Sequence, residues 1–482
     1  MKRFLRHPLI LPIAVLAVIV GAVYGLHFKS RTPRCDRIIL IVADALRADH
    51  VGCYGAPGNP TPNIDALAAR GWRFTDALAP GSETVTSNRA LFTGLHPYRA
   101  AGIGRQGAVR PGVVTIASHL RQAGFHTVGF SAQPIISPQF GFAQGFESFT
   151  CLPSDDDPVT DSAVNWIAHH RRDRYFALVY LLSPHHPYDL ASISQGERHT
   201  LESEPSPSVT VTFFRQGSKD VIAPIEDPKK LPLRLYFWPG AKPGCAKLGL
   251  LHALYKAAVR NADARLGRIM DAIGDDDRAL VIFLADHGEE WQDHGHVLHG
   301  YSLFREVLRV PFIVRTPGAR ERSIATPVTH LDVAPTVFDL AGVSCPRDLD
   351  GCSLVRPDAI PTRTLFAENY QVFNAFCPPK FTLRTVHECA AYRPGEAIFC
   401  CPEYGHAGDA HPAGFKWLRY DLTADPAQQH PLSLLASNPR CKELREYHVK
   451  SHSGMVAACV RPAVKLPPDL RAHLRALGYI AK

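Results

Sequence analysis

The 482-residue sequence predicts an α/β protein with a doubly wound, mostly parallel sheet. Two apolar runs of strand length, residues 38–42 and 280–285, are each followed by polar residues: Asp44 after the first, and Asp286 with His287 after the second. Continuous apolar runs are typical of parallel strands that are buried on both faces. Between the two runs, helical patterns alternate with further strand-like runs, as a doubly wound sheet requires.

The remaining elements follow from periodicity and from helix start and stop signals. They are a helix over residues 63–70, a helix over 113–123, strands over 126–130 and 175–182, and a helix over 248–273. Between residues 191 and 244 Ser, Pro and charged residues are frequent, so we expect an insertion or lid there. We expect three parts: an anchor and connector (1–35), a catalytic domain (36–352) and a smaller Cys-rich C-terminal subdomain (353–482).

The composition indicates a globular chain and argues against one class of partner. Hydrophobic residues make up 46% of the sequence and charged residues 20%, which is typical of globular proteins. The formal net charge is +8, but no block of Lys and Arg with interleaved aromatic residues occurs, so we expect no nucleic-acid partner. A mild basic balance serves solubility, and it also favours anionic substrates or anionic lipid.

The N-terminus predicts a membrane anchor. Residues 9–26 contain no charge over 18 positions, which is close to the length that crosses a bilayer. Lys2, Arg3 and Arg6 precede this stretch, as expected for a cytoplasmic end, although basic residues also follow it. A cleaved signal peptide is the alternative, but its apolar region is usually shorter. We therefore expect an uncleaved transmembrane helix with the catalytic domain on the outer, periplasmic or extracytoplasmic side.

Cysteine usage fits an exported chain. Eight of the 12 cysteines follow residue 344, and such an even, clustered set predicts disulfides of unknown connectivity. A zinc site built on Cys400 and Cys401 is the alternative, but the sequence lacks a CxxC pair there. The eight residues are Cys345, Cys352, Cys377, Cys389, Cys400, Cys401, Cys441 and Cys459.

Asp44, Asp286 and His287 are candidate ligands of a divalent metal. In an open α/β sheet, ligands bind outside the carboxyl ends of the strands, which is where these three residues are expected. Carboxylate oxygens and a neutral imidazole nitrogen suit such an ion. The alternative is that Asp286 caps the following helix and that His287 lies on an ordinary loop.

Thr84 is a candidate nucleophile. It lies in a Ser/Thr-rich turn before a helix that we expect to begin near Ser87. A hydroxyl at a helix N-terminus lies in positive potential, and contact with a metal would lower its pKa further. The alternative is plain capping of the helix by Thr84, Thr86 or Ser87.

Several segments in fixed order resemble the motifs of the sulfatase family, within the alkaline phosphatase superfamily. The resemblance is continuous over about residues 36–345 and reappears in YDLTADP at 420–426 and in the terminal LRALGYI. The segments are ADALRADHVGCYG at 43–55, TVTSNRALFTG at 84–94, SPHHPY at 183–188, ADHGEE at 285–290 with the nearby LHG, and THLDVAPTVFDLAG at 329–342.

The resemblance implies a metal site and a nucleophile. It assigns Asp44, Asp286 and His287, together with Thr84, as ligands of one divalent ion. It also places Thr84 at the position of the nucleophile, where family sulfatases have cysteine. Zinc or manganese suits a site that contains histidine, although calcium also occurs in sulfatase-like sites.

The resemblance further implies residues that contact the substrate. His185 and His299 match histidines that contact the transferred group in related phosphotransferases, so both are expected to be catalytic and substrate-binding. Asn88 stands where the family has arginine, and Arg89 is adjacent, so this pair is the expected counterpart in substrate binding. Ala45 replaces the second of two paired aspartates.

The departures from the family pattern favour a phosphoric ester as substrate. Sulfatases oxidise the Cys or Ser of a C/S-x-P-x-R pattern to formylglycine, and threonine cannot yield that aldehyde. Membrane-anchored phosphoethanolamine and phosphoglycerol transferases instead use a metal-bound threonine. We therefore expect a membrane-anchored hydrolase or transferase that acts on a phosphodiester or phospholipid head group through Thr84. The alternatives are a sulfuric ester hydrolase and a non-catalytic member that binds an anionic glycan or lipid.

Overall fold

The computed structural model describes most of the chain after the predicted anchor. The predicted anchor (residues 9–26) lies outside the described residues, and no described helix is long and apolar enough to cross a membrane. The described residues are 34–100, 109–153, 155–216, 219–224, 242–276, 278–300, 302–373, 384–393, 396–403, 414–433, 441–447 and 450.

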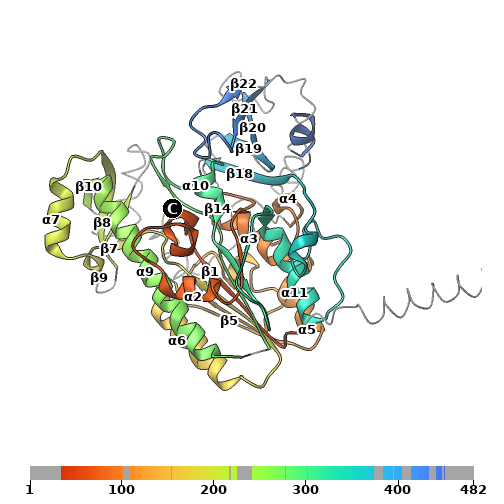
Figure 1. The fold of residues 1–482 in the computed structure, drawn as a ribbon. Coiled ribbons are helices and arrows are strands. Elements are labelled where there is room, and N and C mark those ends of the chain that lie inside the picture. The colour runs from red at the N-terminus through yellow and green to blue at the C-terminus, as the bar shows by residue number, and fades with distance from the viewer. Residues whose placement is uncertain are drawn as a thin grey trace, which may run out of the picture.

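An eight-stranded mixed sheet forms the centre of the molecule, and the predicted α/β fold is confirmed (Figure 1). Strand β1 (Arg37–Ala43) lies between β11 (Ala279–Ala285) and β6 (Tyr175–Leu181) and is parallel to both. β4 (His126–Ser131) and β5 (Ser148–Cys151) extend the parallel part beyond β6. On the other side lie β15 (Phe312–Arg315), β2 (Trp72–Phe74) and β16 (Arg322–Ile324), and β15 is antiparallel to β11.

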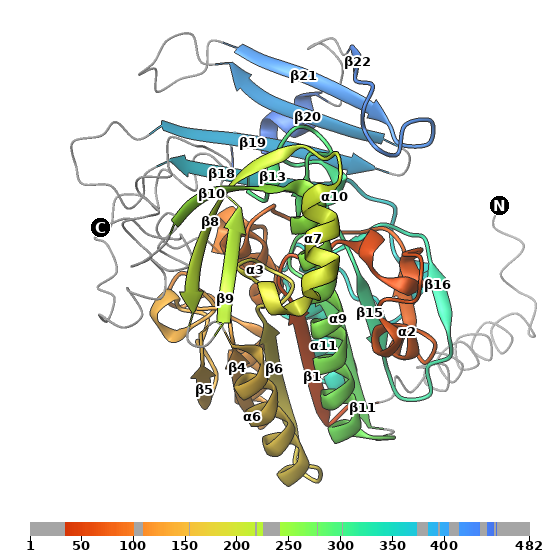
Figure 2. The same cartoon turned by 90° about the vertical axis from the view of Figure 1, so that its left-hand side faces the viewer.

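Helices cover both faces of this sheet (Figures 1 and 2). β1, β6 and β11 are buried along their whole length because both faces are covered, which explains their continuous apolar sequence. One face packs against α2 (Pro62–Ala68), α6 (Asp156–His169) and α9 (Leu248–Ile273). The other packs against α3 (Thr84–Thr93), α5 (Ile116–Gln122) and α11 (Val333–Ala341).

The predicted helices are present, and two starts need correction. α9 has the predicted bounds, whereas α5 begins at Ile116, three residues after the predicted start at residue 113, because a capping box built by Thr115 and Ser118 precedes it. α3 begins at Thr84, three residues before the expected start near Ser87. Glu83 is at the N-cap position and forms no capping hydrogen bond through its side chain, and Thr84 is the first residue of the helix.

The segment that we expected to be an insertion forms a small lobe beside α9 (Figure 1). Its four strands form an antiparallel sheet in the order β10-β8-β9-β7, and α7 (Gln195–Ser203) is part of the same lobe. The strands are β7 (Tyr188–Asp189), β8 (Ser208–Gln216), β9 (Lys219–Pro224) and β10 (Lys242–Lys247). We predicted no specific structure here because Ser, Pro and charged residues dominate the segment as a whole, although β8 itself alternates apolar and polar residues.

A five-stranded antiparallel sheet follows the catalytic domain and lies above it in Figure 1. Its first strand contacts two site loops: the amide of Glu368 donates to the Pro80 carbonyl at 3.0 Å, and Asn369 Nδ2 donates to the Gly300 carbonyl at 2.9 Å. The strands are β18 (Leu365–Phe373), β19 (Arg384–Arg393), β20 (Glu396–Glu403), β21 (Gly414–Asp421) and β22 (Leu432–Ser433).

Short helices and two small sheets lie around the carboxyl edge of the central sheet. The helices are α4 (Pro97–Ala100) and α10 (Arg305–Leu308). Two small sheets contain β12 (Glu290–Trp291) with β13 (Val297–Leu298), and β3 (Ala77–Leu78) with β14 (Arg309–Val310) and β17 (Val328–Thr329).

The disulfide prediction fails where the structure tests it. Cys345 and Cys352 have free thiols, and Cys352 Sγ accepts a hydrogen bond from Arg363. Cys389 and Cys400 are register partners on adjacent strands, but their side chains lie outside the description. Cys377 and Cys459 are among the residues that are not described, so pairing of the remaining cysteines stays a prediction.

Candidate active site

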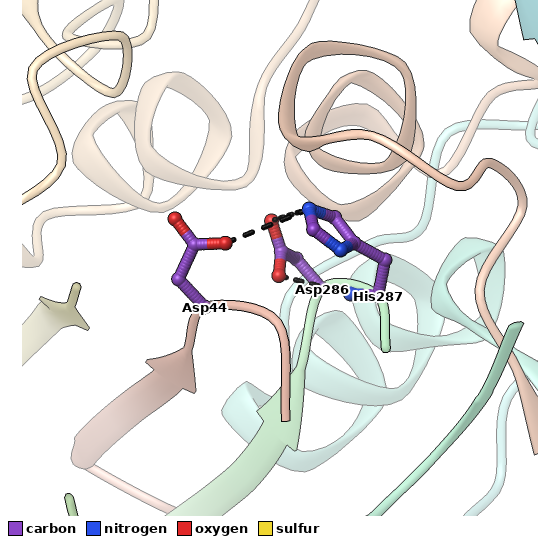
Figure 3. A group of neighbouring side chains, drawn as sticks. All are labelled: Asp44, Asp286 and His287. Atoms are coloured by element: carbon purple, nitrogen blue, oxygen red, sulfur yellow. Dashed lines mark hydrogen bonds and ion pairs between the residues drawn. The ribbon is translucent and has the colours of Figure 1, made fainter. Parts of the chain in front are cut away.

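The carboxyl ends of β1 and β11 bring Asp44, Asp286 and His287 together (Figure 3). All three side chains are fully buried. His287 Nε2 lies 3.5 Å from Asp44 Oδ1 and 3.6 Å from Asp286 Oδ2. The parallel register of the two strands explains the arrangement, because Ala43 is paired with Ala285 and the next residues leave the sheet side by side.

The charge of this group fits a divalent cation. Neither Asp44 nor Asp286 forms an ion pair with a lysine or arginine in the described part of the chain. Asp44 Oδ1 accepts no hydrogen bond there. Burial and the charge of Asp286 raise the pKa of Asp44 well above its usual value. A metal ion would remove this cost, so the residues fit the ion that the family resemblance implies.

His287 is held in the tautomer that a metal ligand requires. Its Nδ1 lies 2.9 Å from the Gly288 carbonyl, which can only accept, so Nδ1 carries the proton and Nε2 has the free lone pair. Burial lowers the pKa of His287, which favours the neutral ring. Gly288 is required for close packing, because a Cβ there would lie 2.0 Å from the Glu306 carbonyl oxygen.

Asp286 is fixed by four donors. Its Oδ2 accepts from Tyr180 Oη at 2.6 Å and from Asn88 Nδ2 at 3.1 Å. Its Oδ1 accepts from the amides of Ala45 at 3.2 Å and His287 at 2.9 Å. Ala45, which replaces the family's second aspartate, has a φ of 60° and thus supplies a backbone donor to this carboxylate. These donors orient Asp286 toward the His287 ring.

Asp44 is oriented by Gln133, from the loop after β4. Gln133 Nε2 donates to Asp44 Oδ2 at 2.5 Å, while Gln133 Oε1 accepts from the Ile135 amide at 3.2 Å. Both ends of this amide are therefore engaged, and its orientation is defined. Gln133 therefore places a neutral side chain beside the Asp44 carboxylate.

Thr84 joins the same group. Its side chain is 2% exposed, and Oγ1 lies 3.3 Å from His287 Nε2. As the first residue of α3, its hydroxyl lies at the positive end of the helix dipole. An unprotonated imidazole nitrogen, two carboxylates and a hydroxyl thus converge, as the sequence predicted.

The two predicted histidines lie beside this group. The His299 ring centroid is 4.3 Å from that of His287 and 4.9 Å from that of His185. His299 Nδ1 lies 2.9 Å from Glu289 Oε1. Burial raises the pKa of Glu289 to about 8. His186 stacks on His185 at 4.2 Å, so three imidazoles border the metal ligands on one side.

Asn88 contacts the active-site residues through its amide group, whereas Arg89 is buried within helix α3. Asn88 Nδ2 donates to Asp286, to Tyr180 Oη at 2.8 Å and to the Thr84 carbonyl at 2.8 Å, so its amide group stabilises the ligand residues themselves. Arg89 is only 1% exposed within the wholly buried helix α3. The substrate-binding role expected for the two residues stays a prediction.

Sequence reasoning missed Tyr180, Gln133 and Glu289. Tyr180 is the one residue with a polar tip near the carboxyl end of the apolar strand β6, and that signal could have identified it. Glu289 follows His287 by two residues in the already suspected segment. Nothing in the sequence shows that Gln133 reaches Asp44, because the contact depends on how β4 and β1 flank β6.

Comparison with known proteins identifies the family. The family model described as Sulfatase matches residues 36–343. This chain belongs to the sulfatase family. The resemblance inferred from the motifs is thereby confirmed, and the chain is a sulfatase-like hydrolase with a candidate site for one divalent metal.

Individual relatives are distant. The chain is 26% identical to the uncharacterized sulfatase YidJ of Escherichia coli over 65% of this chain and 69% of that protein. It is 23% identical to an N-acetylglucosamine-6-O-sulfatase of Bacteroides thetaiotaomicron over 72% of this chain and 74% of that protein.

Solved structures share the fold. A protein solved with its substrate D-glucosamine-2-N,6-O-disulfate superposes with a TM-score of 0.67 at 18% identity, covering 88% of this chain and 99% of that chain. The phosphonate monoester hydrolase of Agrobacterium radiobacter superposes with a TM-score of 0.60 at 19% identity, covering 90% of this chain and 98% of that chain.

Proposed function

We propose that this sulfatase-family chain hydrolyses a sulfuric ester, with Thr84 as the nucleophile at a divalent metal site. The relatives named above support the substrate class, since two of them are named as sulfatases and a third protein was solved with a sulfated glucosamine as substrate. A sulfated glycan is therefore the first substrate to test. The observation that carries the mechanism is the position of Thr84 Oγ1, 3.3 Å from His287 Nε2 at the start of α3.

The proposed ion would be held by Asp44, Asp286 and His287, with Thr84 beside them. When bound, it would lower the pKa of the threonine hydroxyl and withdraw charge from a substrate oxygen. Tyr180, Asn88 and Gln133 keep the two carboxylates in place through the hydrogen bonds described above. Because α3 begins at Thr84, its dipole adds to the stabilisation of an oxyanion at that residue.

The reaction would proceed in two steps. Thr84 Oγ releases its proton to water and forms a bond to sulfur, while the bond from sulfur to the ester oxygen breaks and leaves a sulfated threonine. His299, held through Nδ1 by Glu289, is placed to donate a proton from Nε2 to the departing oxygen. His185 would contact the charged sulfate oxygens. Attack by water then regenerates Thr84.

A phosphoric ester is the second candidate, and Thr84 itself is the observation that favours it. Threonine cannot form the aldehyde that family sulfatases use, whereas a hydroxyl can attack phosphorus directly. The structural similarity to a phosphonate monoester hydrolase shows that this fold accommodates phosphorus esters. The same residues would then form a phosphorylated threonine.

The deciding experiment measures turnover of a sulfated glucosamine, an aryl sulfate, a phosphodiester and a phosphonate monoester by the metal-loaded full chain. Thr84→Ala should reduce turnover of the true substrate by about 1000-fold or more, and Thr84→Ser should restore part of it. Thr160→Ala is the matched control, since Thr160 is equally buried but bonds only within α6. Turnover that survives Thr84→Ala would exclude this nucleophile, and mass spectrometry of the acid-quenched enzyme would show which group Thr84 carries.

We further propose that the chain is anchored in a membrane by residues 9–26, with the catalytic domain outside the cytoplasm. The uncharged N-terminal stretch and the basic residues before it support this placement. Release of the active protein by salt or alkali, without detergent, would contradict it.

A further inference from the structure

A second group of metal-ligand side chains lies apart from the active-site ligands. Glu290, His294 and Glu306 each offer one ligand atom, and these atoms all lie within 4.8 Å of one another. Glu290 belongs to β12 and is fully buried, Glu306 belongs to α10, and His294 lies in the turn between β12 and β13. Three chain segments therefore direct one imidazole and two carboxylates toward a common point.

The orientation of His294 is fixed by contacts outside the group. Its Nε2 lies 3.0 Å from the Gln428 carbonyl, which can only accept, so Nε2 carries the proton. The ring also stacks on Phe304, with centroids 3.6 Å apart and an interplanar angle of 6°. The free lone pair of Nδ1 then points at the Glu306 carboxylate, with which it is in close contact. A metal-bound histidine typically has its other nitrogen on a backbone carbonyl in this way.

Two acceptors in contact require a cation between them. Two arginines near these segments are directed to other carboxylates: Arg47 pairs with Asp49 and Asp293, and Arg305 pairs with Asp76. Burial lowers the pKa of His294, but the hydrogen bond and charge of Glu306 raise it above its usual value. A proton held between the two side chains is therefore the competing occupant. A proton would pair His294 with Glu306 alone, whereas a divalent ion would also take Glu290 as a ligand.

We propose that Glu290, His294 and Glu306 bind a second divalent cation of the zinc class, distinct from the catalytic ion. One nitrogen and two carboxylate oxygens leave room for water as a fourth ligand, which suits zinc or cobalt. We assign the site a structural role because it is linked to Gln428. His294 contacts the Gln428 carbonyl, and Gln428 Oε1 accepts a hydrogen bond from the Arg305 amide at 2.8 Å. Gln428 follows β21, so the ion would join the loop of the catalytic domain to the C-terminal sheet.

The experiment uses the full chain carrying Asp286→Asn, which removes a ligand of the first site. This protein is stripped with chelator, loaded with Zn²⁺ or Co²⁺, desalted and analysed for metal content. We expect one equivalent of ion per chain, and in the cobalt form an absorption spectrum typical of a nitrogen and oxygen ligand set. Adding Glu306→Gln should reduce the content to near zero, whereas adding Glu321→Gln, the same change at an exposed residue, should leave it unchanged.

Absence of bound metal in the Asp286→Asn protein would overturn the proposal and assign His294 and Glu306 to a proton-sharing pair. Retained metal after Glu306→Gln would also overturn it, because the ion would then lie elsewhere. If Glu306→Gln prevents folding, the Asp286→Asn protein alone tests the proposal. Chelator should lower its melting temperature, and zinc should restore it. The result does not depend on the substrate or on Thr84, so it is separate from the test of the proposed reaction.

Discussion

The two ends of the paired strands β1 and β11 have opposite electrostatics. At their amino ends, Arg37 at the start of β1 forms two hydrogen bonds with Asp276, just before β11. At their carboxyl ends, Asp44 and Asp286 are buried, and among the described residues their one basic neighbour within ion-pair distance is the neutral His287. Between these ends both strands are apolar and buried, so the two ends differ only in the polar residues that flank the strands.

The amino ends of the two strands carry a structural ion pair, whereas the carboxyl ends carry the candidate active site. At the amino end, each buried charge has a partner of opposite sign, so the free energy of desolvation is offset within the protein. At the carboxyl end, two carboxylates approach one another, and only a cation from outside can offset the cost. Substitutions at the two ends should therefore have different effects on activity and on stability.

The largest effect is expected from Asp44→Asn. Loss of a ligand should abolish binding of the catalytic ion and reduce turnover by about 1000-fold or more. The free energy of unfolding of the metal-free protein should not fall, because the substitution removes one of two close buried charges. Calorimetry of metal binding and denaturant unfolding of the stripped protein measure both quantities. A marked loss of metal-free stability would show that the Asp44 charge is already compensated within the protein.

A smaller effect is expected from Tyr180→Phe. The hydroxyl donates to Asp286 Oδ2 at 2.6 Å, and loss of such an orienting bond typically weakens metal binding by about 10- to 100-fold. Excess metal should restore most of the activity, which would not happen if Tyr180 itself reacted. The dissociation constant of the ion, compared with that of a Tyr175→Phe control at the start of β6, checks this expectation.

The smallest effect on activity is expected from Asp276→Asn. Arg37 and Asp276 are largely buried, and breaking their pair should lower the free energy of unfolding by about 1–3 kcal/mol. Turnover and metal content should stay unchanged, since the pair lies at the opposite end of the sheet. A loss of metal binding in this variant would contradict the independence of the two ends.

The pair should also shape stability in acid. Burial raises the pKa of Asp276, but the hydrogen bonds and charge of Arg37 outweigh burial and hold that pKa below its usual value. The contribution is therefore present above the unfolded pKa and is lost as pH falls through the lower, folded one. Unfolding of the metal-free protein below about pH 4 should be less pH-dependent in Asp276→Asn than in the unsubstituted chain. Equal slopes for the two proteins would show that the pair contributes nothing there.

The sequence predicted the features that depend on strong local patterns. The 26-residue helix α9 has the predicted bounds because its apolar period is long, and β11 and all of β1 after Arg37 are apolar. Parallel pairing of β1 and β11 then brings Asp44, Asp286 and His287 together. Thr84 was predicted from its place before a helix, and the family resemblance matched it to the position of the nucleophile. The start of α3 was wrong by three residues, because Thr86 and Ser87 resemble capping residues although the whole helix is buried.

Features that depend on distant contacts were not predictable. Gln133 reaches Asp44 from a loop 89 residues away in sequence, and Tyr180 reaches Asp286 across 106 residues. The small antiparallel sheet with α7 was not predicted, because the alternating pattern of β8 stands among Ser, Pro and charged residues and its partner strands carry no matching pattern. In each case the position of the contact is set by the packing of elements and not by neighbouring residues.

The order of strands around β1 also bears on synthesis of the chain. β1 pairs only with β6 and β11, whose residues follow it by more than one hundred and more than two hundred positions. A growing chain therefore carries the uncovered segment RIILIVA for most of the time needed to produce the catalytic domain. Such a segment has high β-propensity and aggregates readily when exposed. Until Ala285 has emerged, slow elongation therefore prolongs the risk of aggregation, and a chaperone that binds extended apolar chain would lower it.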